Sequence, residues 1–166
     1  NLDWPRRWKL TITAGVLVCG LAAFAFKYQD YFTGGATSLG ARFGYWRAAW
    51  ATTKSHPFTG TGPGTFQTAY TKYRKIPKNR KMEPTKLVHN DYLQQASDSG
   101  LPGFAIYTTF IIGSLVLLWR KICCDGLGFA VWLGVLGWAL QGVVDFGLYV
   151  PALAWPAFLG LGWLWG

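Results

Sequence analysis

Two side chains in this sequence are suited to polar chemistry, a histidine and an arginine within one basic and aromatic stretch. His89 precedes Asn90, and its near-neutral pKa suits it to accept a proton from a hydroxyl group. Arg42 lies in the same stretch and stays positively charged at physiological pH. The other histidine, His56, precedes Pro57 in an expected turn and is the weaker candidate for a base. A lone histidine is more often a structural hydrogen-bonding residue, so that interpretation of His89 also stays open.

The composition places these residues in a membrane protein. Of the 166 residues, 51% are hydrophobic and only 14% are charged, whereas soluble domains usually have about a quarter charged residues. This excludes a disordered chain, a coiled coil, a collagen-like fibre and a disulfide-rich module. Uncharged runs at 10–26 and 101–119 are each long enough for one span, and 127–166 is long enough for two. We therefore predict an all-α polytopic membrane protein with about four transmembrane helices.

The distribution of Lys and Arg predicts the topology. Basic residues precede the first span and follow the second, so both flanks are expected in the cytoplasm. The expected segments are a cytoplasmic flank with the first transmembrane helix (1–26), an external loop with short helices (27–100), a second transmembrane helix (101–119), a cytoplasmic loop (120–126) and a transmembrane hairpin (127–166). A signal peptide is a second interpretation of the N-terminus. Because the chain starts at Asn1 rather than Met, we expect a fragment without independent activity.

The external segment contains three features that suit ligand contact. Residues 42–54 predict an amphipathic helix, and its simplest interpretation is an interfacial helix with solvated arginines. The glycine-rich run 60–66 has N–H groups suited to an anion, although a turn is preferred because the P-loop ending is absent. Residues 72–86 hold seven Lys or Arg and one acid, which would attract anionic headgroups or an acidic or phosphorylated glycan. Nucleic acid is not expected, because no recognition module surrounds this loop.

The segments around the second span and the hairpin complete the pattern. Residues 87–97 predict a helix that leads into the second span and carries His89. Asp145 falls near the break in the hairpin, where hydration or pairing with a loop Arg or Lys is preferred over catalysis. Pro151 and Pro156 are expected to kink the last helix and to make room for a lipid tail.

Several motifs in this chain occur in an order that resembles one protein family. They are Arg42-x-x-Tyr45-Trp46-x-x-Ala49, His56-Pro57-x-x-Gly60-x-Gly62-x-Gly64-x-Phe66, His89-Asn90-x-Tyr92-Leu93-Gln94, Gly100-Leu101-Pro102-Gly103 and, in the hairpin, Val144-Asp145-Phe146 and Pro151. From about Ala36 onward, this ordered set resembles the large periplasmic loop and following helices of the O-antigen ligase and O-antigen polymerase family. One departure is Asp98, where the family often has Glu.

The resemblance implies a fold, an activity and roles for individual residues. It implies a mostly helical, C-type glycosyltransferase of the bacterial inner membrane, with 27–100 facing the periplasm. Such enzymes move a glycan from an undecaprenyl-diphosphate carrier to an acceptor hydroxyl, with no metal or other cofactor. His89 would activate the acceptor and Arg42 would hold the diphosphate. Substrate contacts are expected from Trp46, Asn90, Tyr92, Arg47, Gly62 and Gly64.

The resemblance leaves several functions open. The acceptor is a lipid A core for a ligase, which we favour, a growing glycan for a polymerase, or a protein hydroxyl for an O-oligosaccharyltransferase. Because the loop lacks a carboxylate pair, direct displacement with inversion is more natural than retention. The alternative is an anion transporter subunit, of the kind described for bicarbonate, with a basic external loop. A scaffold that binds anionic membrane lipids is the third possibility, and it predicts that Arg42→Lys is harmless.

Overall fold

A computed structural model describes residues 5–27, 29, 37–73, 85–122 and 126–166. Within these residues every regular element is a helix, so the all-α prediction is confirmed. The elements are α1 (Arg6–Lys27), α3 (Thr37–Ser55), α4 (Phe66–Tyr73), α5 (Asp91–Lys121), α6 (Gly126–Gln141), the short 3₁₀-helix η2 (Gly147–Tyr149) and α7 (Pro151–Trp165). Most of the expected basic stretch 72–86 lies outside the described residues.

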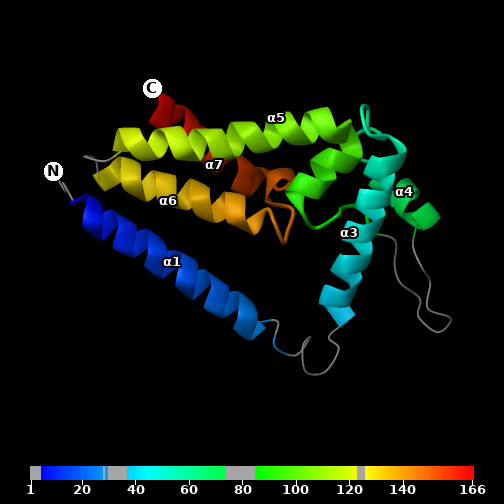
Figure 1. Cartoon of the computed structure of the whole chain (residues 1–166), viewed down its shortest axis with the longest axis horizontal. Coiled ribbons are helices and arrows are strands. Elements are labelled where there is room, and N and C mark those ends of the chain that lie inside the picture. Colours follow the sequence, from blue (N-terminus) through cyan, green and yellow to red (C-terminus); the bar gives the residue numbers. More distant parts are fainter. Residues whose placement is uncertain (1–4, 28, 30–36, 74–84, 123–125) are drawn as a thin grey trace.

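The helices form a group of long rods with a smaller cap at one end. In Figure 1, α1, α5, α6 and α7 extend along the long axis, and α3 and α4 lie at one end of them. The core of the rods joins α5, α6 and α7 through buried side chains that include Ile111, Leu118, Phe129, Trp132 and Leu161. A second core lies beneath α3 and α4 and consists of Ala48, Ala49, Phe66, Tyr70 and Val88. The cap therefore has its own apolar support, which Val88 connects to the segment before α5.

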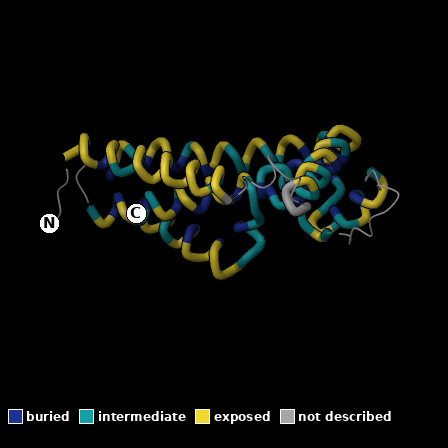
Figure 2. The backbone as a smooth tube through the Cα atoms, turned by 90° about the horizontal axis from the view of Figure 1, so that it is seen from below, coloured by how far each residue is buried: buried dark blue, intermediate teal, exposed yellow. Residues whose placement is uncertain are grey.

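Two of the four expected spans coincide with helices that are long and apolar enough to cross a membrane, α1 over Arg6–Phe26 and α5. Large apolar side chains are exposed along both helices, as suits a surface that faces lipid. Figure 2 shows exposed residues along the long helices. The helices α6 and α7 have 16 and 15 residues. At 1.5 Å per residue they extend only about 22–24 Å, which is less than the roughly 30 Å of a bilayer core. The count of four spans therefore stays a prediction.

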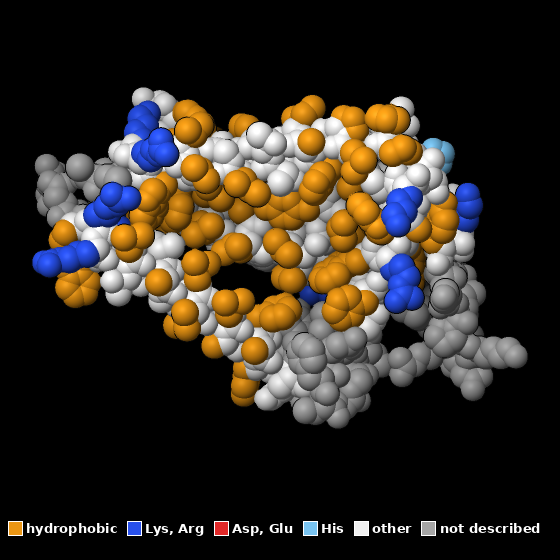
Figure 3. All heavy atoms as spheres, in the orientation of Figure 1, with side chains coloured by type: hydrophobic (Ala, Val, Ile, Leu, Met, Phe, Trp, Pro, Cys, Tyr) orange, Lys and Arg blue, Asp and Glu red, His pale blue; other side chains and the backbone are white. Residues whose placement is uncertain are grey.

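The basic flanks of the first two spans meet at one end of the molecule. Lys9 near the start of α1 is only 1% exposed, and its Nζ donates a hydrogen bond to the carbonyl of Ile122 at 2.8 Å. Ile122 directly follows α5, where the exposed end of a helix has a partial negative charge that favours a cation. Figure 3 shows Lys and Arg side chains at the two ends of the visible face, with apolar side chains between them. Both flanks thus lie at the same end of the molecule, and the side of the membrane that this end faces stays a prediction.

Helix α5 begins later than the sequence pattern predicts. We expected a helix from Leu87, but α5 starts at Asp91, because the side chain of Asn90 accepts a hydrogen bond from the N–H of Leu93 at 2.8 Å and caps the helix. The placement of His89 on a helix is therefore wrong. His89 instead has a φ of 57°, in the left-handed region that residues other than glycine rarely adopt.

A kink at Gly100 divides α5 into two parts. Gly100 has φ 72° and ψ −173°, a conformation that only glycine adopts readily. Two residues later, Pro102 has no N–H, so the carbonyl of Asp98 loses the donor that a regular helix would supply. The N–H of Gly62 donates to this carbonyl at 2.9 Å instead.

The glycine-rich loop satisfies the remaining backbone groups that the kink leaves unpaired. The N–H of Leu101 turns away from its helical partner Ser97 and donates to the carbonyl of Pro57 at 2.7 Å. The N–H of Thr61 then donates to the carbonyl of Ser97 at 3.0 Å. A Cβ at Gly60 would overlap the backbone of Asp98 in α5, so only glycine fits there. The preferred interpretation of this loop as a turn therefore agrees with its geometry.

The apolar hairpin breaks near Asp145, as predicted. Helix α6 ends at Gln141, and α7 begins at Pro151. Because Pro151 is the first residue of α7, it begins the helix and does not kink it, so that part of the expectation is wrong. The helix continues through Pro156 to Trp165.

Candidate functional site

One face of α3 contacts the backbone and the ring of His89. Arg42, Tyr45 and Trp46 are spaced three and four residues apart, which places them on the same side of the helix. The indole N–H of Trp46 donates to the carbonyl of His89 at 3.1 Å. The ring of Tyr45 stacks on the imidazole, with 5.8 Å between ring centroids and 24° between planes. Ala49, on the same face, is fully buried, so this face of α3 packs inward.

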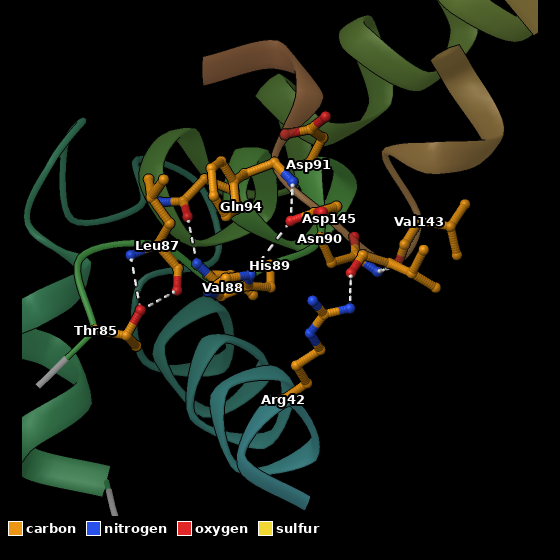
Figure 4. A network of polar contacts seen from close by, with 12 residues as sticks. Arg42, Thr85, Leu87, Val88, His89, Asn90, Asp91, Gln94, Val143 and Asp145 are labelled. Carbon is orange, nitrogen blue, oxygen red and sulfur yellow. Dashed lines mark hydrogen bonds and ion pairs between the residues drawn. The ribbon is translucent and has the colours of Figure 1, made fainter. Parts of the chain in front are cut away.

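The turn formed by residues 143–146 joins the hairpin to this face. The Nη1 of Arg42 donates to the carbonyl of Val144 at 2.8 Å. The side-chain amide of Asn90 donates to the carbonyl of Val143 at 2.6 Å. Figure 4 shows that these side chains approach the 143–146 turn from α3 and from the start of α5. A segment more than fifty residues away in sequence thus brings Arg42 and the neighbourhood of His89 together.

Asp91, the first residue of α5, forms hydrogen bonds with residues on both sides of the same turn. Its N–H donates to the carbonyl of Gly142 at 2.7 Å, and its Oδ2 accepts from the N–H of Leu148 at 2.9 Å. The carboxylate is 1% exposed. A Cβ at Gly142 would lie 2.9 Å from Asp91 Oδ2, so this approach requires glycine or a shift of the carboxylate. Asp91 therefore holds the turn in register with the residues that precede it.

His89 forms a pair with Asp145 in the 143–146 turn. Nδ1 of His89 lies 3.3 Å from Oδ1 of Asp145, which also accepts from the N–H of Phe146 at 3.1 Å. A carboxylate only accepts, so the hydrogen of the neutral imidazole resides on Nδ1 and Nε2 is the basic nitrogen. The ring of Phe146 meets the imidazole edge-on at 4.7 Å. The imidazole is therefore held between Tyr45 and Phe146 and oriented by Asp145.

The surroundings of His89 favour its neutral form. Burial lowers the pKa of His89 below its ordinary value of 6.5. The hydrogen bond with Asp145 opposes this, the charge of Arg42 lowers the pKa further, and the charge of Asp145 raises it. The net direction is downward, so the imidazole is unprotonated and able to accept a proton at neutral pH.

An apolar cavity of about 1070 Å³ begins beside this cluster and extends along the rods. Asn90 and Tyr92 line it, and the hydroxyl of Tyr92 donates to the carbonyl of Ala139 at 3.0 Å. Val143 of the 143–146 turn also lines the cavity, and the remaining lining residues come from α1, α5 and α6 and include Leu10, Ile112, Leu115 and Leu136. Figure 3 shows a hollow between α1 and the other rods. The cavity thus connects the polar cluster to apolar surface that suits a hydrocarbon chain.

The structure brings only some of the predicted site residues together. Arg42, Trp46 and Asn90 join His89, whereas Arg47 is exposed on α3 and Tyr92 lies on the cavity wall. Two of the predicted residues lie instead in the loop that packs on the kink of α5, and they are Gly62 and Gly64.

The two histidines occupy different regions. His56 follows the end of α3, about three helical turns from Tyr45, and lines a separate cavity of about 390 Å³ between α3 and α4. His56 therefore lies apart from the cluster around His89.

Sequence reasoning did not assign a site role to Asp145. It expected hydration or a loop Arg or Lys as the partner of this carboxylate, whereas the structure pairs it with His89. The signal was present, because an acidic residue in the break of an apolar hairpin is unusual. Tyr45 and Phe146 are positions in the motifs that resemble the family, and no local pattern indicates that their rings enclose the imidazole of His89.

Comparison with known proteins identifies the family. The model of the O-antigen ligase family matches residues 2–108, which is 107 of the 166 residues. The matched region contains α1, α3, α4 and the start of α5, with Arg42 and His89, while the 143–146 turn follows it. Among curated proteins, none matches the chain significantly. The chain belongs to the O-antigen ligase family.

Proposed function

We propose that this protein transfers a glycan from an undecaprenyl-diphosphate carrier to an acceptor hydroxyl, with His89 as the general base. Membership in the O-antigen ligase family indicates a membrane protein with ligase-type glycosyltransferase activity. The observation that carries the residue assignment is the His89–Asp145 pair beside Arg42. An apolar cavity begins next to this cluster, where Asn90 and Val143 line it. A lipid A core is the favoured acceptor, with a growing glycan or a protein hydroxyl as the other choices.

The proposed step is a direct displacement. The acceptor oxygen attacks the anomeric carbon while Nε2 of His89 takes its proton, and the bond from that carbon to the diphosphate breaks. The leaving diphosphate keeps the bonding electron pair. Asp145 accepts the Nδ1–H of His89 and stabilises the imidazolium that forms. One displacement inverts the anomeric centre, and no metal is required in this scheme.

Arg42 is the proposed partner of the diphosphate. Its Nη1 donates to the carbonyl of Val144, which fixes the guanidinium beside His89. A guanidinium is positively charged and suits the negative charge that develops on the leaving oxygen. A guanidinium forms paired bonds to phosphate that an ammonium group does not reproduce.

The remaining contacts follow from the shape of the molecule. The apolar cavity suits the polyprenyl tail, with Asn90 and Tyr92 at its polar end. Trp46, Arg47 and the loop glycines Gly62 and Gly64 stay proposed contacts for the glycan part. In this arrangement the hairpin α6–α7 completes four spans, residues 27–100 face the periplasm, and the protein lies in the bacterial inner membrane.

A pair of histidine variants tests the base assignment. The full-length protein and its His89→Ala and His56→Ala variants are expressed in a host that builds carrier-linked glycan but lacks its own ligase and polymerase. Gels of surface lipopolysaccharide and of carrier-bound glycan report transfer. We expect transfer by the wild type and by His56→Ala, and a loss of about 10²–10⁴-fold for His89→Ala. Transfer by His89→Ala at the wild-type rate contradicts the assignment.

The same assay distinguishes the acceptors. Glycan on the lipid A core identifies a ligase, longer glycan chains identify a polymerase, and glycosylated protein identifies an O-oligosaccharyltransferase. Membrane-inserted protein that leaves all glycan on the carrier, in hosts that offer each acceptor, contradicts the proposed function.

A further inference from the structure

The residue before His89 is held by a buried side chain that the proposed mechanism does not use. The N–H of Val88 donates to Oε1 of Gln94 at 2.8 Å (Figure 4). Both residues are buried, at 0% and 2% exposure. Gln94 lies in the first turns of α5, so its amide reaches back over the start of the helix to the segment that contains His89.

The orientation of the Gln94 amide is set by Asp98, one helical turn further along. Nε2 of Gln94 donates to Oδ1 and Oδ2 of Asp98 at 3.0 and 2.9 Å. Oδ2 also accepts from the hydroxyl of Tyr149 at 3.2 Å. Because a carboxylate only accepts, the amide must present its NH₂ group to Asp98 and its oxygen to Val88. Asp98 thus determines which end of the amide faces the segment before His89.

This arrangement bears on a strained residue. A φ of 57° is unusual for histidine, and such conformations persist only where the surroundings determine them. The indole N–H of Trp46 donates to the carbonyl of His89, which fixes the backbone on the C-terminal side of this residue. Gln94 holds the N–H of Val88, on the N-terminal side. The two bonds together fix the backbone that directs the imidazole toward Asp145.

We propose that Gln94, oriented by Asp98, is a positioning residue for His89. Its effect on catalysis depends on the proposed role of His89, but the position of the imidazole can be measured without catalysis. Without the Gln94 bond, the backbone at His89 relaxes and the imidazole leaves its place between Tyr45 and Phe146. It then regains contact with water.

Two sets of variants test this inference. Gln94→Met removes both hydrogen bonds at similar size, and Gln95→Met is its matched control, because Gln95 donates to Tyr149 at 3.1 Å from the next position of α5. Gln94→Glu places two carboxylates about 3 Å apart, at the present Gln94–Asp98 separation. Adding Asp98→Asn to Gln94→Glu exchanges the two groups, so that the amide NH₂ at position 98 donates to the carboxylate at position 94. The amide oxygen at position 98 still accepts from the hydroxyl of Tyr149.

The measurement is the rate at which diethyl pyrocarbonate modifies His89 in the full-length protein, followed against pH by mass spectrometry. This reagent attacks the neutral imidazole, so the midpoint of the profile reports the pKa of His89. The charged and titratable groups that face the ring are Arg42 and Tyr45 from α3 and Asp145 from the 143–146 turn. For Gln94→Met and Gln94→Glu we expect the midpoint to rise toward 6.5, because the ring loses the burial that lowers its pKa, with modification at least about threefold faster.

The controls decide the outcome. Gln95→Met and the double variant Gln94→Glu/Asp98→Asn are expected to stay near the wild-type profile. A wild-type profile for Gln94→Met, or a double variant no closer to the wild type than Gln94→Glu, overturns the inference. If Gln94→Glu does not reach the membrane, the comparison of Gln94→Met with Gln95→Met decides alone. In the transfer assay, Gln94→Met is expected to lower kcat and leave KM for the donor unchanged. If His89→Ala keeps full transfer, the proposed function fails while the modification profile still tests the positioning.

Discussion

Replacing Asp145 by Asn separates the charge of this carboxylate from its shape. The new amide oxygen can still accept from the N–H of Phe146 and from Nδ1–H of His89, so the 143–146 turn has no reason to rearrange. What is lost is the negative charge that stabilises the imidazolium as His89 takes the acceptor proton. The loss therefore acts on the transition state more than on substrate binding.

The size of the effect follows from the geometry of the pair. Hydrogen bonds to charged groups contribute about 1.5–3 kcal/mol, against about 0.5–1.5 kcal/mol for neutral ones. The His89–Asp145 separation of 3.3 Å is long, and the Asp145 side chain is 36% exposed, so water screens part of the interaction. We expect a loss of about 1–2 kcal/mol in the transition state, which corresponds to about a five- to thirtyfold lower kcat.

The pH dependence gives the variant a second signature. Burial lowers the pKa of His89, and both the hydrogen bond and the charge of Asp145 raise it. Removing the charge lowers the pKa further, so Asp145→Asn loses activity at pH 7–8 but keeps its remaining activity to lower pH than the wild type. The acid side of the kcat/KM profile, measured with carrier-linked glycan, reports this displacement.

Three results would refute this reasoning. A wild-type kcat with an unchanged acid limb removes Asp145 from the mechanism. An acid limb that moves to higher pH contradicts the sign of its effect on the pKa of His89. A loss above about 10³-fold is typical of a buried triad carboxylate, and contradicts the weak, partly hydrated pair that the geometry describes.

Two further variants test the phosphate partner and the kink. Arg42→Lys keeps the charge but loses the paired donors, so kcat/KM for the donor is expected to fall about ten- to a hundredfold. The control Lys54→Arg, on the same helix, is expected to change kcat/KM less than about twofold. Equal activity of both variants favours the lipid-binding scaffold. Gly100→Ala places a Cβ 2.7 Å from the backbone of residues 57–58 at a φ of 72°, so we expect the free energy of unfolding to fall by about 1–3 kcal/mol and the Tm in detergent to be lower. The control Gly113→Ala, with no atom within 4 Å of its Cβ, is expected to raise the Tm slightly. Similar Tm changes for both variants contradict the kink.

The sequence was sufficient to predict the helices whose signals are local. The apolar runs predicted α1, the second part of α5 and the break in the hairpin, because length and hydropathy alone decide whether a segment suits a bilayer. The face of α3 with Arg42 and Trp46 followed from helical spacing. The start of α5 was missed because the helix pattern continued through 87–90, whereas Asn90 offered a cap that ends this continuation.

The site itself depends on contacts that no local pattern reports. His89 pairs with Asp145 across 56 positions, and Arg42 reaches Val144 across 102. Spacing within a segment indicates which side chains share a face, but not which distant turn covers that face. The role of the glycine-rich loop was hidden for the same reason, because its partner is the kink that Gly100 and Pro102 create.

The position of the 143–146 turn links assembly of the fold to chemistry. Arg42 and His89 lie on separate segments, and each contacts this turn, which is supplied by the hairpin of α6 and α7. The family match contains both residues but ends before the hairpin. The loop alone therefore brings Tyr45 and Trp46 to His89, whereas the carboxylate that orients the imidazole arrives only when the hairpin packs on α5. On the proposed mechanism, a loop correctly folded against α5 transfers poorly until the hairpin is in place, because the hairpin also supplies part of the cavity wall proposed for the lipid tail and the carbonyl that binds Arg42.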